Sequence, residues 1–143
     1  MVKKFLTYIN EKALFQPSDK VLLAVSGGMD SVVMLHLFHK SGLGFAVAHC
    51  NFGLRGEESD ADEQFVKKLA KKYKVPFFSE QFDTEAFAIQ EKISVQMAAR
   101  VLRYEWFRTI CTENGFACVA TAHHLNDTLE TVQQLMAEQR APV

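Results

Sequence analysis

The chain has 143 residues, with 16 Lys and Arg against 17 Asp and Glu, so its formal net charge is −1. Hydrophobic residues make up 48% and charged residues 23%, which is typical of a folded domain and excludes disordered, collagenous and low-complexity classes. No apolar run approaches the roughly 20 residues that cross a bilayer, and no secretory signal is visible. The near-neutral charge argues against nucleic-acid binding by charge alone, although a local basic groove remains compatible with it.

The cysteine pattern points to a reducing compartment. The count is three, which is odd, and no C-x-x-C pair occurs. This usage argues against a zinc or iron–sulfur site and favours small buried hydrophobic residues. We therefore expect a cytoplasmic protein that does not enter a membrane.

Hydrophobic periodicity predicts alternating helices and strands along the chain. A short N-terminal helix is expected before Pro17. Strands are predicted at residues 21–25, 45–49, 76–82 and 117–121, and helices at residues 30–40, 59–73, 94–114 and 125–136. Gly42 and Gly115 are expected to end two of these helices, and Ser59 with Asp62 is expected to form a capping box.

This alternation indicates βαβ units with right-handed crossovers. We predict an α/β fold in which a parallel sheet is sandwiched by helices, of the Rossmann-like type, in a single domain over residues 1–143. Ligands of such sheets bind beyond the carboxyl ends of the strands. The segments that follow the strands are therefore the first place to look for chemistry.

The segment after the first strand has the residue types of an anion site. It reads Ser26, Gly27, Gly28, Met29, Asp30 and Ser31, and it opens a helix. Glycines allow a tight turn close to a ligand, and the N–H groups of a helix start, with serine hydroxyls, can hold a phosphate. A carboxylate beside a phosphate implies a Mg²⁺ ion between them, so Asp30 is the candidate metal ligand. The simpler alternative is a Gly-Gly turn with an ordinary helix cap.

The hexapeptide matches neither G-x-x-x-x-G-K-[ST] nor G-x-G-x-x-G, which argues against a Walker-type or dinucleotide site. It resembles the S-G-G-x-D-S signature of the PP-loop ATP pyrophosphatases. The resemblance implies an adenine nucleotide alpha hydrolase fold that cleaves ATP between the α- and β-phosphates. Its usual products are an adenylated substrate and pyrophosphate.

Three further blocks resemble those of the tRNA(Ile)-lysidine synthetases. Residues 49–56 (HCNFGLRG), 100–104 (RVLRY) and 120–131 (ATAHHLNDTLET) follow the patterns H-x-N-H-x-L-R-G, R-x-x-R-Y and A-T-A-H-H-x-x-D-x-x-E-T. Phe52 replaces the second His of the first pattern, so we assign it no catalytic role. The tail after Thr131 also departs from the family. We therefore expect an N-terminal nucleotide-binding domain without the family's C-terminal tRNA-binding domains.

The resemblance implies a two-step reaction. The C2 oxygen of the wobble cytidine of tRNA(Ile) is adenylated by ATP, and the amine of L-lysine then displaces AMP to form lysidine. The expected partners are the tRNA(Ile) anticodon loop and L-lysine, the expected cofactors are ATP and Mg²⁺, and a homodimer remains open. The alternatives are a PP-loop tRNA 2-thiolation enzyme, which the lack of C-x-x-C disfavours, and a folded but inactive ATP-binding fragment.

Two pairs of charged residues are candidates on the predicted helices. Asp127 and Glu130 stand at i, i+3, which predicts a shared helix face, and they are expected to bind the lysine amine or Mg²⁺ unless they only cap the helix. Arg100 and Arg103 have the same spacing. They are expected to contact phosphate or tRNA, with plain solvent exposure as the alternative.

Other candidates follow the second and fourth strands. Arg55 comes after a glycine at a strand end and is expected to contact phosphate. His49 and Asn51 are expected either to contact the adenosine or to shape the loop. Of the adjacent histidines, His124 is expected to face the cleft rather than His123, and a joint zinc site is not expected because neighbouring side chains diverge.

Overall fold

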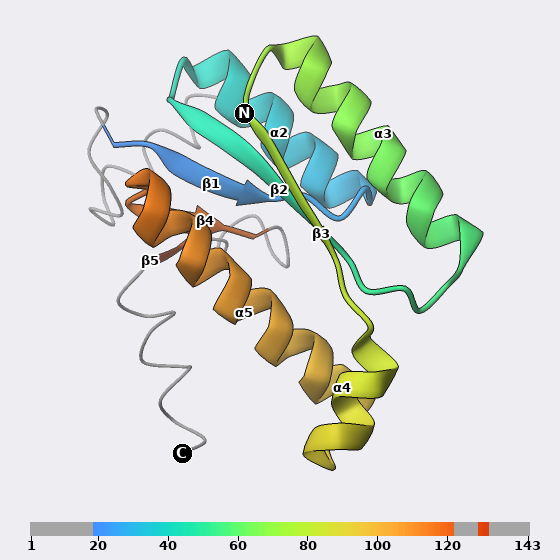
Figure 1. Ribbon diagram of the computed structural model, residues 1–143. Helices are drawn as coiled ribbons and strands as arrows, with labels where there is room; N and C mark the ends of the chain where they lie inside the picture. Colours follow the sequence, from blue (N-terminus) through green and yellow to red (C-terminus); the bar gives the residue numbers. More distant parts are fainter. Residues whose placement is uncertain (1–18, 122–128, 132–143) are drawn as a thin grey trace.

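The computed structural model describes residues 19–121 and 129–131. Their elements alternate along the chain (Figure 1), and they are β1 (Val21–Ala24), α2 (Met29–Ser41), β2 (Phe45–Asn51), α3 (Glu57–Tyr73), β3 (Phe77–Gln81), α4 (Thr84–Glu91), α5 (Val95–Asn114), β4 (Cys118–Ala120) and β5 (Leu129–Thr131). The predicted strands at residues 21–25, 45–49, 76–82 and 117–121 are each found within two residues of their expected ends.

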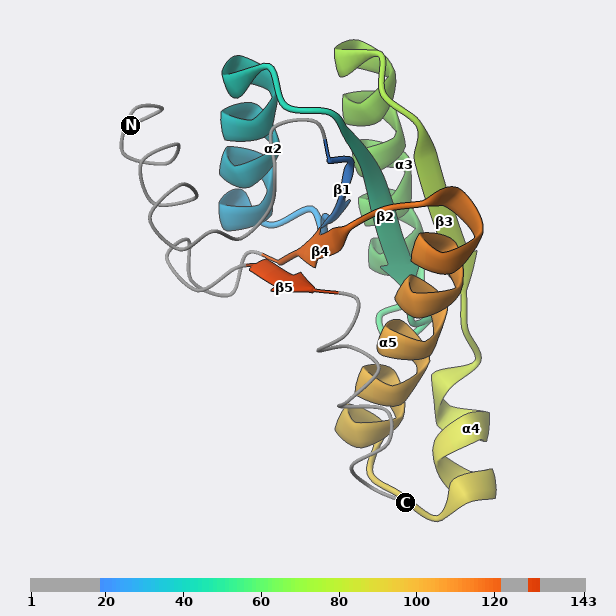
Figure 2. The ribbon, with the colours of Figure 1, turned by 90° about the vertical axis from the view of Figure 1, so that its left-hand side faces the viewer.

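The strands form one sheet in the order β3-β2-β1-β4-β5, in which the first four are parallel and β5 is antiparallel to β4. Helices α2 and α3 lie on one face and α5 on the other (Figure 2). The predicted parallel sheet sandwiched by helices is therefore confirmed. Central strands covered on both faces must be apolar throughout, and this explains the continuous runs at β1 and β2.

The two faces of the sheet bury separate hydrophobic clusters because successive strand side chains point to opposite sides. On the α2 and α3 side, Val21 and Leu23 pack with Phe38. On the α5 side, Leu22 packs with Phe107. All five side chains are at most 1% exposed, so truncation of any of them to Ala would cost about 2–5 kcal/mol.

Helix ends follow local rules in most cases. Gly42 and Gly115 end α2 and α5 with φ of 72° and 74°, as predicted. The hydroxyl of Ser94 caps α5 by accepting a hydrogen bond from the N–H of Met97 at 3.1 Å. Helix α4 was not predicted. Asp83 caps its first turn, and Lys92 ends it after only eight residues, too few for a clear periodic pattern.

The predicted capping box at Ser59 and Asp62 is wrong. Helix α3 already begins at Glu57, after Gly56. Ser59 is therefore inside the first turn and buried, and its hydroxyl accepts a hydrogen bond from the N–H of Arg55 at 3.1 Å. It fixes the loop before the helix instead of capping the helix.

The predicted helix over residues 125–136 is wrong where it can be compared. Leu129–Thr131 form β5, with Ala120 opposite Leu129 and Cys118 opposite Thr131. Without β5, strand β4 would be the open edge of the parallel sheet, and pairing satisfies its outward-facing backbone groups. The other residues of that predicted helix, and the predicted N-terminal helix, lie outside the described residues.

Helix α5, with 20 residues, is the longest of the described part. It is amphipathic, since Phe107 and Ile110 are buried while Arg100 and Glu105 are exposed. Among residues 19–121 and 129–131, no helix combines the length and the apolar character needed to cross a membrane.

Candidate nucleotide site

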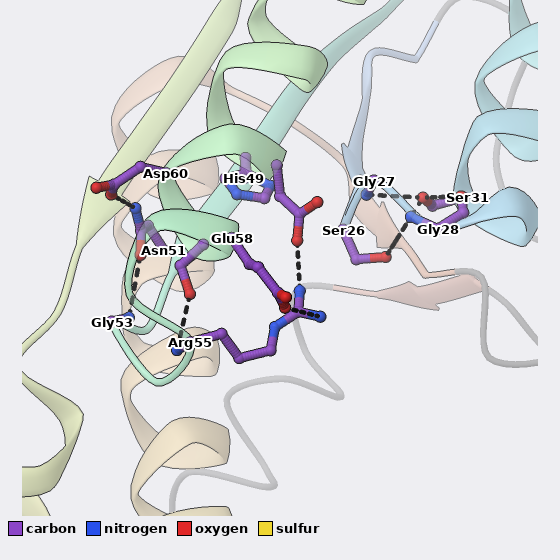
Figure 3. Close-up of polar contacts among 12 residues, drawn as sticks. Ser26, Gly27, Gly28, Ser31, His49, Asn51, Gly53, Arg55, Glu58 and Asp60 are labelled. Atoms are coloured by element: carbon purple, nitrogen blue, oxygen red, sulfur yellow. Dashed lines mark hydrogen bonds and ion pairs between the residues drawn. The ribbon is translucent and has the colours of Figure 1, made fainter.

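The loop between β1 and α2 is tied together by its own serines (Figure 3). The hydroxyl of Ser31 accepts a hydrogen bond from the N–H of Gly27 at 3.2 Å and donates one to the carbonyl of Gly28 at 2.8 Å. The hydroxyl of Ser26 accepts from the N–H of Gly28 at 3.3 Å. Gly27 has φ of +101°, which side chains rarely adopt. The loop is therefore held in shape by its own hydrogen bonds. Ser31, which is only 3% exposed, makes two of them from the inner side of the loop.

The start of α2 offers backbone donors. Its N-cap residue is Gly28, and no described side chain caps the helix. The N–H groups of the first turn have no intrahelical acceptor, and the helix dipole places partial positive charge there. Met29 is 82% exposed and Asp30 is exposed as well, so an anion can reach these groups from solvent.

A cavity of about 370 Å³ opens beside this loop, on the α5 face of the sheet. The loop and the start of α2 line it at one end, through Ser26, Gly28, Met29, Asp30 and Ser31. The rest of its lining comes from the strand ends and α5, through Ala24, Val25, Ala48, Cys50, Phe52, Arg103, Phe107 and Thr121. The cavity at the carboxyl edge of the sheet thus combines the polar groups of the loop with a largely apolar lining.

The predicted arginine pair divides between two environments. Both guanidinium groups lie over the ring of Tyr104, at 4.9 Å for Arg100 and 5.0 Å for Arg103. Arg103 lines the cavity, whereas Arg100 is exposed. The buried Nε of Arg103 has no hydrogen-bond partner among residues 19–121 and 129–131. A buried donor of this kind is costly unless an acceptor reaches it, so Arg103 is suited to an anionic ligand.

The structure does not bring His49 and Asn51 to the cavity. Both lie on the α3 side of β2 and are at most 4% exposed. Nδ1 of His49 is 2.8 Å from the carbonyl oxygen of Val25, which directly precedes the loop at residues 26–31. The amide of Asn51 donates to Asp60 at 2.9 Å, and its oxygen accepts from Gly53 (Figure 3). The same amide donates to Glu63 at 3.3 Å. Of the two predicted roles, these contacts serve the shape of the loop.

Arg55 is placed next to the loop but not in the cavity lining of the described part. Its guanidinium pairs with Asp62 and, at 3.8 Å, with Glu58 (Figure 3). The carboxylate of Asp62 is so close to Gly27 that a Cβ added there would meet it at 3.6 Å. Arg55 and Asp62 therefore form a charged pair at the outer side of the loop, with the arginine side chain 62% exposed.

Of the three predicted site residues that follow β4, only Glu130 belongs to the described part. His124 and Asp127 are outside it, with His123. Glu130 belongs to β5, opposite Val119. Since Glu130 is in a strand, the helical i, i+3 relation expected between it and Asp127 does not hold.

The donors of the site fit a Mg²⁺ ion that is held mainly by phosphate. Among the described residues, no group of three or more His, Cys, Asp or Glu could hold a metal by itself. Asp30 nevertheless lines the cavity beside the first turn of α2. Mg²⁺ is commonly bound by one or two carboxylates, substrate phosphates and water, and one carboxylate at Asp30 fits such a ligand set.

The three cysteines are protonated and free of disulfides. Burial raises the pKa of the Cys50 thiol from the usual 9.0 to about 12, although nearby Arg103 lowers it in part. Burial also raises the pKa of Cys111 to about 11 and that of Cys118 to about 12. Such thiols are poor nucleophiles at neutral pH, which fits the predicted role as small buried residues.

Our sequence interpretation missed the cavity face of β2. Cys50 and Phe52 line the cavity there, and Phe107 lines it from α5. The signal was present, because alternation along β2 puts Ala48 and Cys50 on one face and His49 and Asn51 on the other, and Phe52 directly follows the strand. The motif had directed attention to its polar members.

Comparison with known proteins agrees with this geometry. A family model described as a PP-loop domain matches residues 1–142. The chain belongs to this family. It is 46% identical over 130 residues to the tRNA(Ile)-lysidine synthase of Bacteroides thetaiotaomicron and 43% identical over 134 residues to that of Chlorobaculum tepidum. These alignments cover 91% of the chain in both cases, but only 30% and 40% of the respective relatives.

Solved structures show the same fold at low sequence identity. The NMN synthetase of Francisella tularensis matches with a TM-score of 0.64 at 18% identity, covering 82% of this chain and 51% of that one. The NH₃-dependent NAD synthetase of Campylobacter jejuni matches with a TM-score of 0.63 at 17% identity, covering 82% and 53%. The fold is thus shared with proteins of different names, and the fold alone does not define the substrate.

Proposed function

We propose that this PP-loop domain binds ATP and activates its α-phosphorus in a tRNA(Ile)-lysidine synthase reaction. The observation that carries the proposal is the preformed loop at residues 26–31, which ends in the open first turn of α2 beside a 370 Å³ cavity. The identity of 46% to a protein named tRNA(Ile)-lysidine synthase supports the choice of substrate. The chain spans about three tenths of that relative's length, so the whole reaction belongs to the proposal.

The reaction needs activation because the C2 oxygen of cytidine is a poor leaving group. In the proposed first step, this oxygen attacks the α-phosphorus of ATP and pyrophosphate leaves. In the second, the amine of L-lysine attacks C2 and AMP leaves. The protein has to align the phosphate, stabilise the developing charge and exclude water.

The residues of this chain divide those tasks. The N–H groups of the first turn of α2 are proposed to hold phosphate oxygens, with the loop kept in shape by Ser31. Arg103 is proposed to donate its buried N–H to a phosphate oxygen in the cavity. Asp30 would hold Mg²⁺, which when bound neutralises charge on the phosphates. Arg55, beside the loop, is proposed to contact the pyrophosphate side.

Lysine and tRNA are assigned to other residues. Asp127 and Glu130 are proposed to bind the lysine amine or a Mg²⁺ ion, and His124 is proposed to contact a substrate. If Asp127 binds the amine, then Asp127→Ala should raise the KM for lysine while ATP binding stays intact, and an unchanged KM would count against this role.

Arg100 is proposed to contact the tRNA backbone, because it is exposed on the helix that also carries Arg103. Charge reversal at Arg100 should therefore weaken tRNA binding more than ATP binding. Equal loss of both, with altered circular dichroism, would point to misfolding.

The proposed function is tested by ATP–pyrophosphate exchange with a tRNA(Ile) transcript, with and without lysine. The assay should compare this chain with one extended to the length of its relatives. Exchange that depends on the transcript supports the proposal. ATP binding without exchange in both proteins would select a non-catalytic nucleotide-binding domain, and full activity of the 143-residue chain would eliminate that alternative.

A further inference from the structure

We propose that Phe52 is the base-stacking residue of the cavity and holds the adenine of ATP against its ring. The inference rests on the proposed function, because it requires that the phosphates of the same nucleotide lie on the loop at residues 26–31. It gives a specific task to a residue that replaces the second His of the H-x-N-H-x-L-R-G pattern.

The strand register places Phe52 beyond the end of β1, where it lines the cavity. Strand β1 ends at Ala24, which is the partner of Ala48, and β2 continues from there to Asn51. Phe52 is four residues beyond Ala48, which is about 13 Å along an extended chain. Phe52 and the loop line the same cavity. Phe52 therefore lies beyond the end of β1, and one cavity connects it with the loop where the phosphates are proposed to bind.

The ring of Phe52 is held in place by neighbouring aromatic rings and by a hydrogen bond to its backbone. It stacks on Phe82, with ring centroids 5.7 Å apart and an interplanar angle of 23°. Phe82 in turn packs edge-on against Trp106 at 6.1 Å. The hydroxyl of Thr84, which is 1% exposed, donates a hydrogen bond to the carbonyl of Phe52 at 2.8 Å. A base therefore meets an ordered ring, and little side-chain entropy is lost on binding.

The chemistry of the cavity also suits a base. Away from the loop, and apart from Arg103 and Thr121, the cavity is lined by small or apolar side chains, which include Ala48, Cys50 and Phe107. The loop and Arg103 contribute polar donors to the same cavity, so the cavity suits a ligand that joins an anionic group to a flat aromatic ring. Phenylalanine cannot exchange a proton, which leaves packing as its contribution.

The test compares Phe52→Leu with wild type by calorimetric titration of ATP and of inorganic tripolyphosphate, which has no base. Phe65→Leu is the matched control, because Phe65 is 44% exposed on α3 and is not among the described cavity-lining residues. We expect Phe52→Leu to weaken ATP binding about tenfold, as loss of one base–aromatic stack does, with tripolyphosphate unchanged. The control should change neither.

A second variant decides the matter if Phe52→Leu fails to fold. Phe52→Trp places an indole on the cavity wall, and we expect ATP to quench its added fluorescence while tripolyphosphate does not. Equal ATP affinity of wild type and a folded Phe52→Leu, or ATP binding without quenching, would overturn the stacking role and leave the proposed function standing. Failure of the wild-type protein to bind either ligand would overturn the proposed function, and the stacking role with it.

Discussion

The two faces of β2 at its carboxyl end differ although they belong to the same few residues. On the α3 face, His49 and Asn51 are buried and hydrogen-bonded to Val25, Asp60 and Glu63. On the α5 face, Cys50 and Phe52 border an open cavity. One face supports the loop, and the other borders the cavity that is proposed to bind the nucleotide. A polar motif residue in a strand can thus act through the scaffold while its apolar neighbour lines the cavity.

The largest effect is expected on the cavity side, at Asp30. Asp30→Ala removes the proposed Mg²⁺ ligand, and we expect affinity for ATP in the presence of Mg²⁺ to fall by roughly tenfold to a hundredfold. In EDTA the sign reverses, because the carboxylate then repels the phosphates and its loss strengthens binding. Titration calorimetry with and without Mg²⁺ measures both effects.

Glu91→Ala, at the exposed end of α4, is the control for general charge. It should change neither affinity. Near-normal Mg²⁺ dependence in Asp30→Ala would remove Asp30 from the metal site.

The second largest effect on ATP affinity is expected at Ser31, whose hydroxyl holds the loop at residues 26–31 in shape. Ser31→Ala removes the acceptor of the Gly27 N–H and the donor to the Gly28 carbonyl. We expect ATP affinity to fall about tenfold and the free energy of unfolding to fall by about 1 kcal/mol. The comparison is Ser41→Ala on the same helix, where the hydroxyl donates to the Leu37 carbonyl at 2.7 Å, far from the cavity. If both variants bind ATP equally, the hydroxyl of Ser31 has no role in binding.

The elements that could be predicted from the sequence are those whose signals lie in nearby residues. The order of strands and helices, the loop at residues 26–31 and the helix ends at Gly42 and Gly115 followed from nearby residues. The start of α3 did not, because Ser59 looks like a cap in sequence but is used by the preceding loop. Strand β5 depends on the open edge of β4, which is a property of the assembled sheet.

The same distinction applies to the site. The anion-binding loop was recognisable because its chemistry is contiguous in the chain. The separation of Arg100 from Arg103 was not, since it depends on how α5 rotates against the sheet. The apolar half of the cavity combines residues from β1, β2, α5 and the end of β4, and only the alternation within β2 was visible in advance.

A smaller effect on binding is expected at Asn51, on the α3 face of β2. Asn51→Ala leaves Asp60 and Glu63 facing each other without their shared donor, so we expect the free energy of unfolding to fall by about 1–3 kcal/mol. ATP affinity should stay within about threefold. Urea denaturation and calorimetry measure the two quantities. The control is Asn114→Ala, which loses one bond to a helix carbonyl. Lost ATP affinity at unchanged stability would instead place Asn51 at the nucleotide.

The smallest effect on function is expected at Cys50, which is on the open face but protonated. Because burial raises its pKa to about 12, the thiolate fraction, and with it the alkylation rate by iodoacetamide, should rise about tenfold per pH unit from pH 8 upward. ATP should slow the labelling of Cys50, which lines the cavity, and not that of Cys111 or Cys118. Peptide mass spectrometry resolves the three sites. Equal protection of all three would mean that ATP acts by stabilising the whole fold and not by covering the cavity beside Cys50.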